Sequence, residues 1–184
     1  MTILIRRAKK TDVDDIVSAD YEWNTFVVED EDFETVSLLN PWCIEPNQIA
    51  EWNKLKKNIF VMAIETFVQT VVKGEQQNIR WVCGGFSYEK TEEGYVVIWF
   101  ATHPKASPTD SIAAIATYMK DLATDNDTVV FHIRDREEAR LRLVLPILQK
   151  SGFAVSLLPD YFEDSIDGWK CTFGPKVPVA AKKT

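Results

Sequence analysis

An unbroken apolar run near the middle of the chain, Val96-Val97-Ile98-Trp99-Phe100, is the feature that most restricts the possible fold. A strand with one face in water alternates apolar and polar residues, whereas this run contains no polar residue. We therefore expect a strand in the middle of a sheet, covered on both faces. Helices on both faces of a mixed sheet meet this requirement, which favours an α/β architecture over a two-sheet sandwich.

Two further strand patterns precede this run, at residues 59–66 and 79–88, and the run itself belongs to a strand at 95–102. Turn residues separate them at Lys73-Gly74 and at 90–94, which predicts an antiparallel meander. Gly84-Gly85 lies within the second strand, where glycines often mark a bulge or a close approach of two backbones.

Helical periodicity marks the segments that would cover the sheet. The clearest helix has apolar residues at the i, i+3, i+4 spacing: Ile112, Ile115, Ala116, Met119 and Leu122. A second has the same spacing: Leu141, Val144, Leu145 and Leu148. We expect this second helix to end near Ser151-Gly152, and we expect Pro146 to kink it or to shift its start.

The two ends of the chain complete the pattern. A strand at residues 3–7 leads into a helix that we expect the Thr11 hydroxyl to cap, with a carboxylate three residues later at Asp14. Ile49, Trp52 and Leu55 predict a further helix, and residues 129–133, 153–158 and 169–173 predict three closing strands, the last two joined by an acidic loop at 161–167. The order predicts a single domain at residues 1–174, built on a mixed, mostly antiparallel sheet with helices on both faces, and a tail at 175–184.

Charge and composition exclude several classes of partner. The net charge of −7 would repel a nucleic acid backbone, so no nucleic acid partner is expected. The most apolar stretch, residues 59–72, is interrupted by Glu65 and Gln69 and is shorter than the roughly 20 residues that a bilayer requires, so no membrane span is expected. Three widely spaced cysteines without metal-ligand spacing predict reduced packing residues in a cytoplasmic protein without a metal site, although a catalytic thiol stays open.

Three segments carry a resemblance to a known family. Residues 5–16 begin with Ile5-Arg6-Arg7-Ala8, residues 94–104 close in Thr102-His103-Pro104, and the second helix ends in Lys150-Ser151-Gly152-Phe153. In this order they resemble the first strand and helix, the fourth strand, and the end of the last helix in the GNAT superfamily of N-acetyltransferases. The resemblance implies a GNAT-like fold and acetyl-CoA as cofactor, with its pantetheine arm along the backbone of Phe100, Ala101 and Thr102.

The resemblance also locates the loop that should bind the diphosphate of the coenzyme. In the family, glycines there let backbone N–H groups at a helix N-terminus close around the phosphates. By position the loop corresponds here to Ser107, Thr109, Asp110, Ser111 and Ile112, which contain no glycine. Instead, Ser107-Pro108-Thr109-Asp110 predicts an ordinary helix start with a hydroxyl cap.

Candidates for the catalytic residues follow from the chemistry of acyl transfer to an amine, which needs a base for the amine and a proton for the departing thiolate. A Tyr that family members often use as the acid corresponds here to Leu148. Tyr161 is the alternative acid, and the candidates for the base are two histidines and two carboxylates: His132, His103, Glu163 and Asp164. Each has an alternative structural role, as a half-buried loop aromatic, a hydrogen-bonded histidine or a solvated acid.

Three functions stay open at this point. The first is an acetyl-CoA-dependent N-acyltransferase that acts on a small-molecule or peptide amine. The acidic run Glu29-Asp30-Glu31-Asp32 would attract such a cationic amine, or it is a solvated surface segment. The second is a catalytically silent GNAT-fold binding or assembly protein that has lost coenzyme binding, as the absent glycines suggest. A third possibility is an unrelated α+β binding protein, and a homodimer stays open for each.

Overall fold

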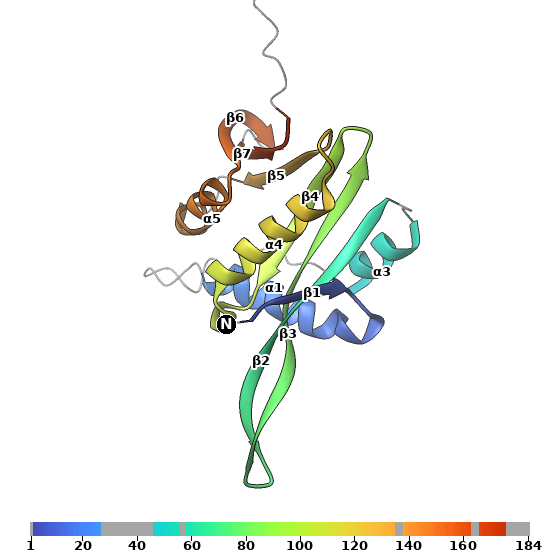
Figure 1. Ribbon diagram of the computed structural model, residues 1–184, viewed down its shortest axis with the longest axis vertical. Helices are drawn as coiled ribbons and strands as arrows, with labels where there is room; N and C mark the ends of the chain where they lie inside the picture. Colours follow the sequence, from blue (N-terminus) through green and yellow to red (C-terminus); the bar gives the residue numbers. More distant parts are fainter. Residues whose placement is uncertain (1, 27–45, 56–57, 135–137, 163–165, 176–184) are drawn as a thin grey trace, which may run out of the picture.

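The computed structural model describes residues 2–26, 46–55, 58–134, 138–162 and 166–175. They form a seven-stranded sheet in the order β1-β2-β3-β4-β5-β7-β6 (Figure 1). The strands are β1 (Leu4–Arg7), β2 (Ile59–Val72), β3 (Glu75–Thr91), β4 (Gly94–Thr102), β5 (Thr128–Arg134), β6 (Ala154–Phe162) and β7 (Ile166–Phe173). Neighbouring strands are antiparallel except β4 and β5, which are parallel. The predicted mixed, mostly antiparallel sheet is confirmed, and β4 is its central strand.

Helices cover both faces of this sheet. They are α1 (Val13–Phe26), α3 (Pro46–Leu55), α4 (Pro108–Leu122) and α5 (Glu138–Lys150), with short 3-10 turns at η1 (Lys10–Asp12) and η2 (Pro104–Ala106). Val61 and Ala63 of β2 pack with α1 and α3, whereas Met62 and Ile64 belong to the core under α4 and α5. Because successive strand residues point to opposite faces, the two clusters lie on opposite sides of the sheet. Among the described residues, every helix is too short or too polar to cross a lipid bilayer.

The two predicted helices of the second half are confirmed in position. The α4 residues Ile112, Ile115, Ala116 and Met119 are all buried. Helix α5 ends as predicted, because Gly152 takes a positive φ of 92° and the N–H of Phe153 donates to the carbonyl of Leu148. Pro146 lies inside α5, which begins at Glu138, so it does not mark the start of the helix.

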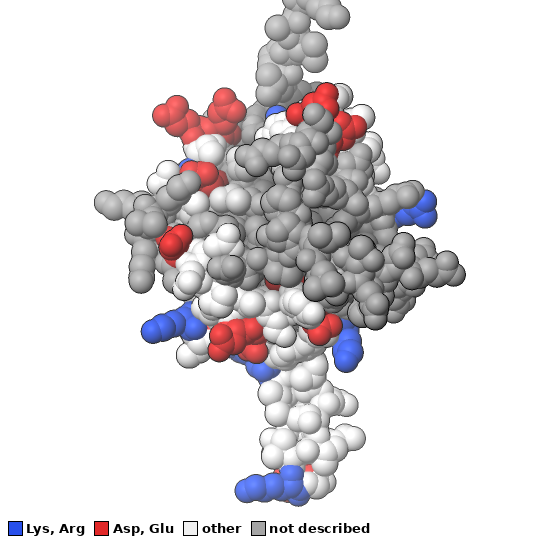
Figure 2. All heavy atoms as spheres, turned by 180° about the vertical axis from the view of Figure 1, so that it is seen from behind, with Lys and Arg blue, Asp and Glu red and all other residues white. Residues whose placement is uncertain are grey.

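The hairpin of β2 and β3 is longer than the sequence predicted. Pairing continues to Val72 and Glu75 around a turn at Lys73-Gly74, where φ is positive. Strand β1 pairs with β2 only as far as Glu65, and β4 pairs with β3 only from Gly84. Within the described part of the chain, residues 66–81 therefore form a two-stranded ribbon. We call residues 66–81 the arm. It projects from the body (Figure 1), and in Figure 2 it is free of charged atoms along most of its length and charged at its tip.

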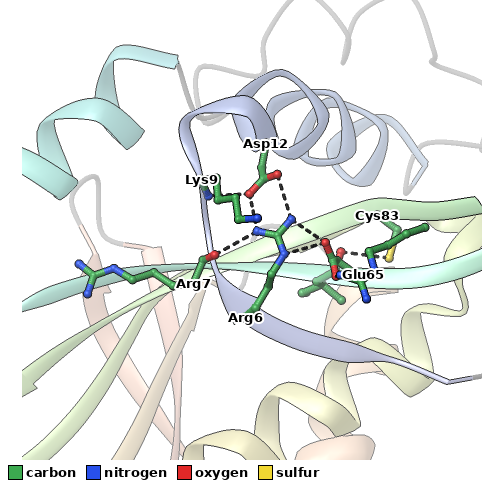
Figure 3. Close-up of polar contacts among 8 residues, drawn as sticks. Arg6, Arg7, Lys9, Asp12, Glu65 and Cys83 are labelled. Atoms are coloured by element: carbon green, nitrogen blue, oxygen red, sulfur yellow. Dashed lines mark hydrogen bonds and ion pairs between the residues drawn. The ribbon is translucent and has the colours of Figure 1, made fainter.

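A buried ion network ties β1 to the start of α1 and to β2 (Figure 3). The Arg6 guanidinium donates to both carboxylate oxygens of Asp12, at 2.6 and 3.0 Å, and its Nε donates to Glu65 at 2.7 Å. Arg80 contacts the second Glu65 oxygen at 3.4 Å. Both carboxylates are buried; Asp12 is paired with Arg6, and Glu65 is paired with Arg6 and with the more exposed Arg80.

The same network corrects the predicted cap of the first helix. Asp12 Oδ2 accepts a hydrogen bond from the backbone N–H of Lys9 at 2.6 Å, and η1 precedes α1. The residue that organises the turn is therefore Asp12 and not Thr11. The Arg6 hydrogen bond, followed by the bond from Lys9, holds the pKa of Asp12 below its ordinary value despite burial.

Candidate functional site

The sheet opens between its two parallel strands. Strand β4 pairs with β5 only from Gly94 and Thr128 to Val97 and Phe131, although β4 continues to Thr102 and β5 to Arg134. Beyond Val97, the β5 side of β4 has no strand partner in the part of the chain that the structure describes. Ligands of open α/β sheets bind beyond the carboxyl ends of the parallel strands, which is where this opening lies.

A bulge in β4 lies where the opening begins. Ser87 of β3 faces Trp99 and the next residue of β3 faces Val97, so Ile98 is the extra residue. Its side chain is 41% exposed, so the expectation that β4 is covered on both faces holds only in part. A bulge bends its strand, so it can direct β4 away from β5 at this point.

Gly84 occupies a crowded position on the other side of β4. The register between β2 and β3 shifts at Ile64 and Glu65, which makes Cys83 the extra residue, next to the glycine pair. A Cβ at Gly84 would lie 2.4 Å from the carbonyl oxygen of Ala101. Both expectations for Gly84-Gly85, a bulge and a close backbone approach, are therefore met at or beside Gly84.

The residues predicted to line the pantetheine arm lie at the open end of β4. Ala101 and Thr102 are buried, and Phe100 is half-buried. Among the described residues, Thr102 Oγ1 is buried without a hydrogen-bond partner. A buried hydroxyl that lacks a partner costs free energy, so this position is suited to a ligand that supplies one.

The start of α4 differs from the predicted cap. Ser107 precedes Pro108 as expected, but it has a left-handed backbone with φ of 53°, and its side chain does not accept a bond from the helix backbone. Its Oγ instead donates to Asp110 Oδ2 at 2.8 Å. Thr109 and Asp110 are exposed, whereas Ser111 and Ile112 are buried. The predicted hydroxyl cap is therefore wrong, because the hydroxyl binds the nearby carboxylate instead.

The structure brings together the two catalytic candidates, Tyr161 and His132. The Tyr161 hydroxyl lies 3.3 Å from Nδ1 and 3.5 Å from Nε2 of His132, and the ring centroids are 4.9 Å apart. His132 directly follows Phe131, the last residue of β5 that pairs with β4. Burial, followed by the positive charge of Lys170, lowers the pKa of His132 below its ordinary value. The imidazole is therefore neutral near pH 7 and able to accept a proton.

Tyr161 was expected in a loop but belongs to β6. The register between β6 and β7 shifts between Leu158 and Phe162, and Asp160 has a positive φ of 51°. The rings of Tyr161 and Phe162 lie over Gly168 of β7, where a Cβ would be 2.7 Å from the Phe162 ring. The irregular strand and the absent side chain of Gly168 allow the Tyr161 ring to reach the His132 ring.

The other predicted candidates have structural roles or lie elsewhere. His103 precedes η2, and its Nδ1 accepts a bond from the N–H of Lys105 at 3.2 Å, while its ring packs against Trp81. Leu148 is fully buried in the core. Glu163, Asp164 and the acidic run at residues 29–32 lie outside the described residues, as does the tail from residue 176.

The thiols of Cys83 and Cys171 fit the packing role that was predicted for them. Both are buried and free. Burial raises the pKa of Cys83 to about 11 and that of Cys171 to about 12. A catalytic cysteine needs a lowered pKa, so neither is suited to be a nucleophile.

Two residues near the opening escaped the sequence analysis. Lys170 of β7 is directly opposite His132, and Asp20 of α1 is a buried carboxylate that accepts a bond from the Trp99 indole at 3.0 Å. The only sequence signal for Asp20 is an acid on the apolar side of a helix. The position of Lys170 depends on strand register, for which the sequence carries no signal.

The arrangement of helices and strands is similar to that of solved N-acetyltransferases. The ribosomal-protein-S18-alanine N-acetyltransferase from Escherichia coli superimposes over 100% of both chains, with a TM-score of 0.56 and 8% identity. The ribosomal-protein-S5-alanine acetyltransferase from Vibrio fischeri superimposes over 96% of this chain and 94% of its own, with a TM-score of 0.55 and 14% identity.

A protein of the GNAT family from Desulfovibrio desulfuricans superimposes over 94% of this chain and 99% of its own, with a TM-score of 0.53 and 12% identity. The chain has a GNAT-like fold. The PaiA N-acetyltransferase from Thermoplasma acidophilum in complex with coenzyme A covers 94% of this chain and 100% of its own at a TM-score of 0.51 and 12% identity. No protein-family model matches the sequence, and no curated protein matches it either. The similarity is therefore one of fold, and the chemistry of this GNAT-fold protein has to be argued from its own residues.

Proposed function

We propose that this protein is an N-acyltransferase that transfers an acetyl group from acetyl-CoA to an amine, at the opening between β4 and β5. The observation that carries the proposal is the position of the Tyr161 and His132 pair, next to the point where the two parallel strands separate. Acyl transfer to an amine requires a proton acceptor and a proton donor. This pair lies at the carboxyl ends of the parallel strands, where ligands of open α/β sheets bind.

The open edge of β4 fits the thioester arm of the donor. Backbone groups of β4 beyond Val97 lack a strand partner on the β5 side, and the buried Thr102 hydroxyl lacks a hydrogen-bond partner among the described residues. An extended amide-containing chain can pair with such an edge as an added strand would. The residues that would hold this arm are Phe100, Ala101 and Thr102.

The start of α4 fits the diphosphate of the donor poorly. It has no glycine, and Asp110 places an exposed carboxylate in the first turn of the helix. A carboxylate about 5 Å from a phosphate charge repels it by about 3 kcal/mol at an effective dielectric constant near 20, before screening. We therefore assign most of the donor affinity to the β4 edge and little of it to the helix terminus.

The acceptor amine must be neutral to attack the thioester carbon. His132 accepts the proton that the amine nitrogen loses as the C–N bond forms, and the lowered pKa keeps its imidazole neutral for this task. The C–S bond breaks, and Tyr161 donates its hydroxyl proton to the leaving sulfur. The hydrogen bond between the two side chains lets the proton pass from His132 to Tyr161, so that both regain their starting states.

The acceptor class is a small-molecule or peptide amine. Acetyl-CoA and a panel of amines would be incubated with the protein, and N-acetylated products would be measured by mass spectrometry. The proposal expects a product that forms only with enzyme and that a Tyr161→Phe, His132→Gln double variant does not form. If no amine of the panel is acetylated while acetyl-CoA binds at the β4 edge, catalysis at this site is contradicted.

The contact between Ser107 and Asp110 favours a second candidate, a silent GNAT-fold binding or assembly protein. In this alternative the side chains of Ser107 and Asp110 satisfy each other at the helix terminus, and the coenzyme has no site. A calorimetric titration separates the two, because the silent protein would show no heat and no thermal stabilisation with acetyl-CoA, whereas a ligand at 100 times its dissociation constant stabilises a protein by about 2.7 kcal/mol.

A further inference from the structure

The arm has two outer edges, and they differ in charge. Residues 75–81 of β3 carry two charges, Glu75 and Arg80, together with three amide side chains, Trp81 and the exposed Ile79. Residues 66–72 of β2 read Thr-Phe-Val-Gln-Thr-Val-Val and carry no charge. Proteins protect exposed strand edges with charges, prolines or bulges, because an unprotected edge pairs with other chains. The β3 edge is protected in this way, and the β2 edge is not.

The β2 edge of the arm also exposes large apolar side chains to water. Phe67 is 43% exposed and Val71 is 65% exposed, and both point to the same face of the ribbon because they are an even number of residues apart. Arg80, directly opposite Phe67, covers part of its ring at 5.8 Å. A two-stranded ribbon of this kind is marginally stable alone in water, and a third strand would stabilise it.

The sequence of this edge is complementary to itself. When a strand pairs antiparallel with a second copy of itself, a two-fold axis perpendicular to the sheet relates the two copies. Side chains that lie on one face of the sheet in one copy lie on the same face in the other. An axis at Gln69 places Phe67 of one copy opposite Val71 of the other, Val68 opposite Thr70, and Gln69 opposite its own copy. Axes at Val68 or Thr70 instead place Phe67 opposite Gln69 or Lys73. Only the axis at Gln69 joins the two exposed apolar side chains, and aromatic with β-branched pairs stabilise cross-strand contacts.

Thr66 is buried and its hydroxyl donates to the backbone carbonyl of Thr2, so the free stretch of the β2 edge begins at Phe67. We propose that two copies of this chain form a homodimer in which residues 67–71 of the two β2 strands pair antiparallel about a two-fold axis at Gln69, so that the arms build one four-stranded sheet. The net charge of −7 on each copy opposes association in general. The uncharged stretch at residues 66–72 lies on the arm, which projects from the body, so this repulsion is weakest there (Figure 2).

Sedimentation equilibrium tests the dimer and its location. Wild type is expected at twice the chain mass of 21.0 kDa. Val71→Lys places a charge in the uncharged stretch of both copies, and we expect the dissociation constant of the dimer to rise by about tenfold or more. Gln76→Lys is the matched control, because Gln76 is exposed and lies directly opposite Val71 on β3, one strand away from the axis. This variant should leave the dissociation constant of the dimer nearly unchanged. Circular dichroism verifies that both variants are folded.

Disulfide trapping tests the register independently of affinity. Gln69→Cys should form a covalent dimer under mild oxidation, because the two thiols meet at the axis, whereas Asn78→Cys, directly opposite Gln69 on β3, should cross-link no more than wild type. A monomeric wild type, a dimer that Val71→Lys leaves intact, aggregates larger than a dimer, or equal cross-linking of the two cysteine variants would each overturn the proposal.

Discussion

The hydroxyl of Tyr161 lies 3.3 Å from Nδ1 of His132, although 29 positions separate the two residues in the chain. Tyr161 is on β6 and His132 is on β5, and β7 lies between these strands in the sheet. The contact therefore crosses over β7. It exists because β6 is irregular before Phe162 and because Gly168 of β7 leaves room for the Tyr161 ring. It places a phenol hydroxyl and an imidazole together at the point where β4 and β5 separate.

Removal of either member of this pair should reduce acyl transfer more than it reduces stability. Tyr161→Phe keeps the ring and removes the proton, and His132→Gln removes the base, so we expect kcat to fall by about a hundredfold in each. The double variant should be little worse than either single one, since the two groups act as a unit. Tyr118→Phe on α4 is the control for loss of a phenol hydroxyl elsewhere. Initial rates that stay within a factor of about two of wild type would contradict the assigned roles.

The pH dependence of the reaction should report His132. Burial and Lys170 lower its pKa below 6.5, so the neutral imidazole persists to lower pH than in a free histidine. A plot of kcat/KM against pH should therefore fall on its acid side with a midpoint below 6.5, and Lys170→Met should move that midpoint upward by removing a neighbouring positive charge. A midpoint above 6.5, or one that persists in His132→Gln, would assign the acid limb to another group.

Stability should depend strongly on Arg6. Removal of one partner of a buried ion pair leaves an uncompensated charge, so Arg6→Met should lower the free energy of unfolding by about 3 kcal/mol in urea titrations. The pKa of Asp12 is lowered in the folded protein, so its contribution is full above the ordinary value of 3.8 and is lost as the pH falls below it. Asp12→Asn should be less stable than wild type at neutral pH and should lose less stability on acidification. Asp14→Asn, an exposed acid of α1, is the control, and a similar response of the two variants would contradict the network.

Much of the fold could be predicted from the sequence because it depends on local periodicity. The apolar run at β4, the i, i+3, i+4 spacing of α4 and the glycine after α5 each follow from residues close together in the chain. The predicted order is confirmed for the α-helices and strands that the structure describes, and the two 3-10 turns were not predicted. The predictions that failed concern details that tertiary contacts decide. The hydroxyl of Ser107 binds Asp110 instead of capping α4. Asp12, which Arg6 holds in place, replaces Thr11 as the residue that organises the start of α1.

The candidate site could be predicted only as separate residues. Tyr161 and His132 were each named from their chemistry, but their contact depends on an irregular strand and on the pairing of β5 with β7. The opening of the sheet at Val97 and Phe131 has no sequence pattern, because β4 stays apolar past the point where β5 departs from it. The length of the arm was missed because its exposed residues alternate too weakly to mark a strand.

The carboxylate at the start of α4 should weaken donor binding. Asp110→Gly removes a negative charge and restores a small residue, so we expect the dissociation constant of acetyl-CoA to fall by about tenfold. Acetyl-pantetheine, which lacks the diphosphate, is the matched control ligand, and its affinity should not change. Calorimetric titration of wild type and variant with both ligands gives the comparison. An unchanged or weaker affinity for acetyl-CoA would show that the diphosphate lies away from Asp110.

Backbone hydrogen exchange with and without saturating acetyl-CoA, followed by mass spectrometry, is the most direct test of donor binding at β4. We expect slower exchange in the peptide that contains Phe100, Ala101 and Thr102, because the donor arm would pair with the open edge of β4, and smaller changes at the start of α4. Exchange that stays unchanged at β4 while the ligand is bound, or the absence of any binding, would contradict the proposed site.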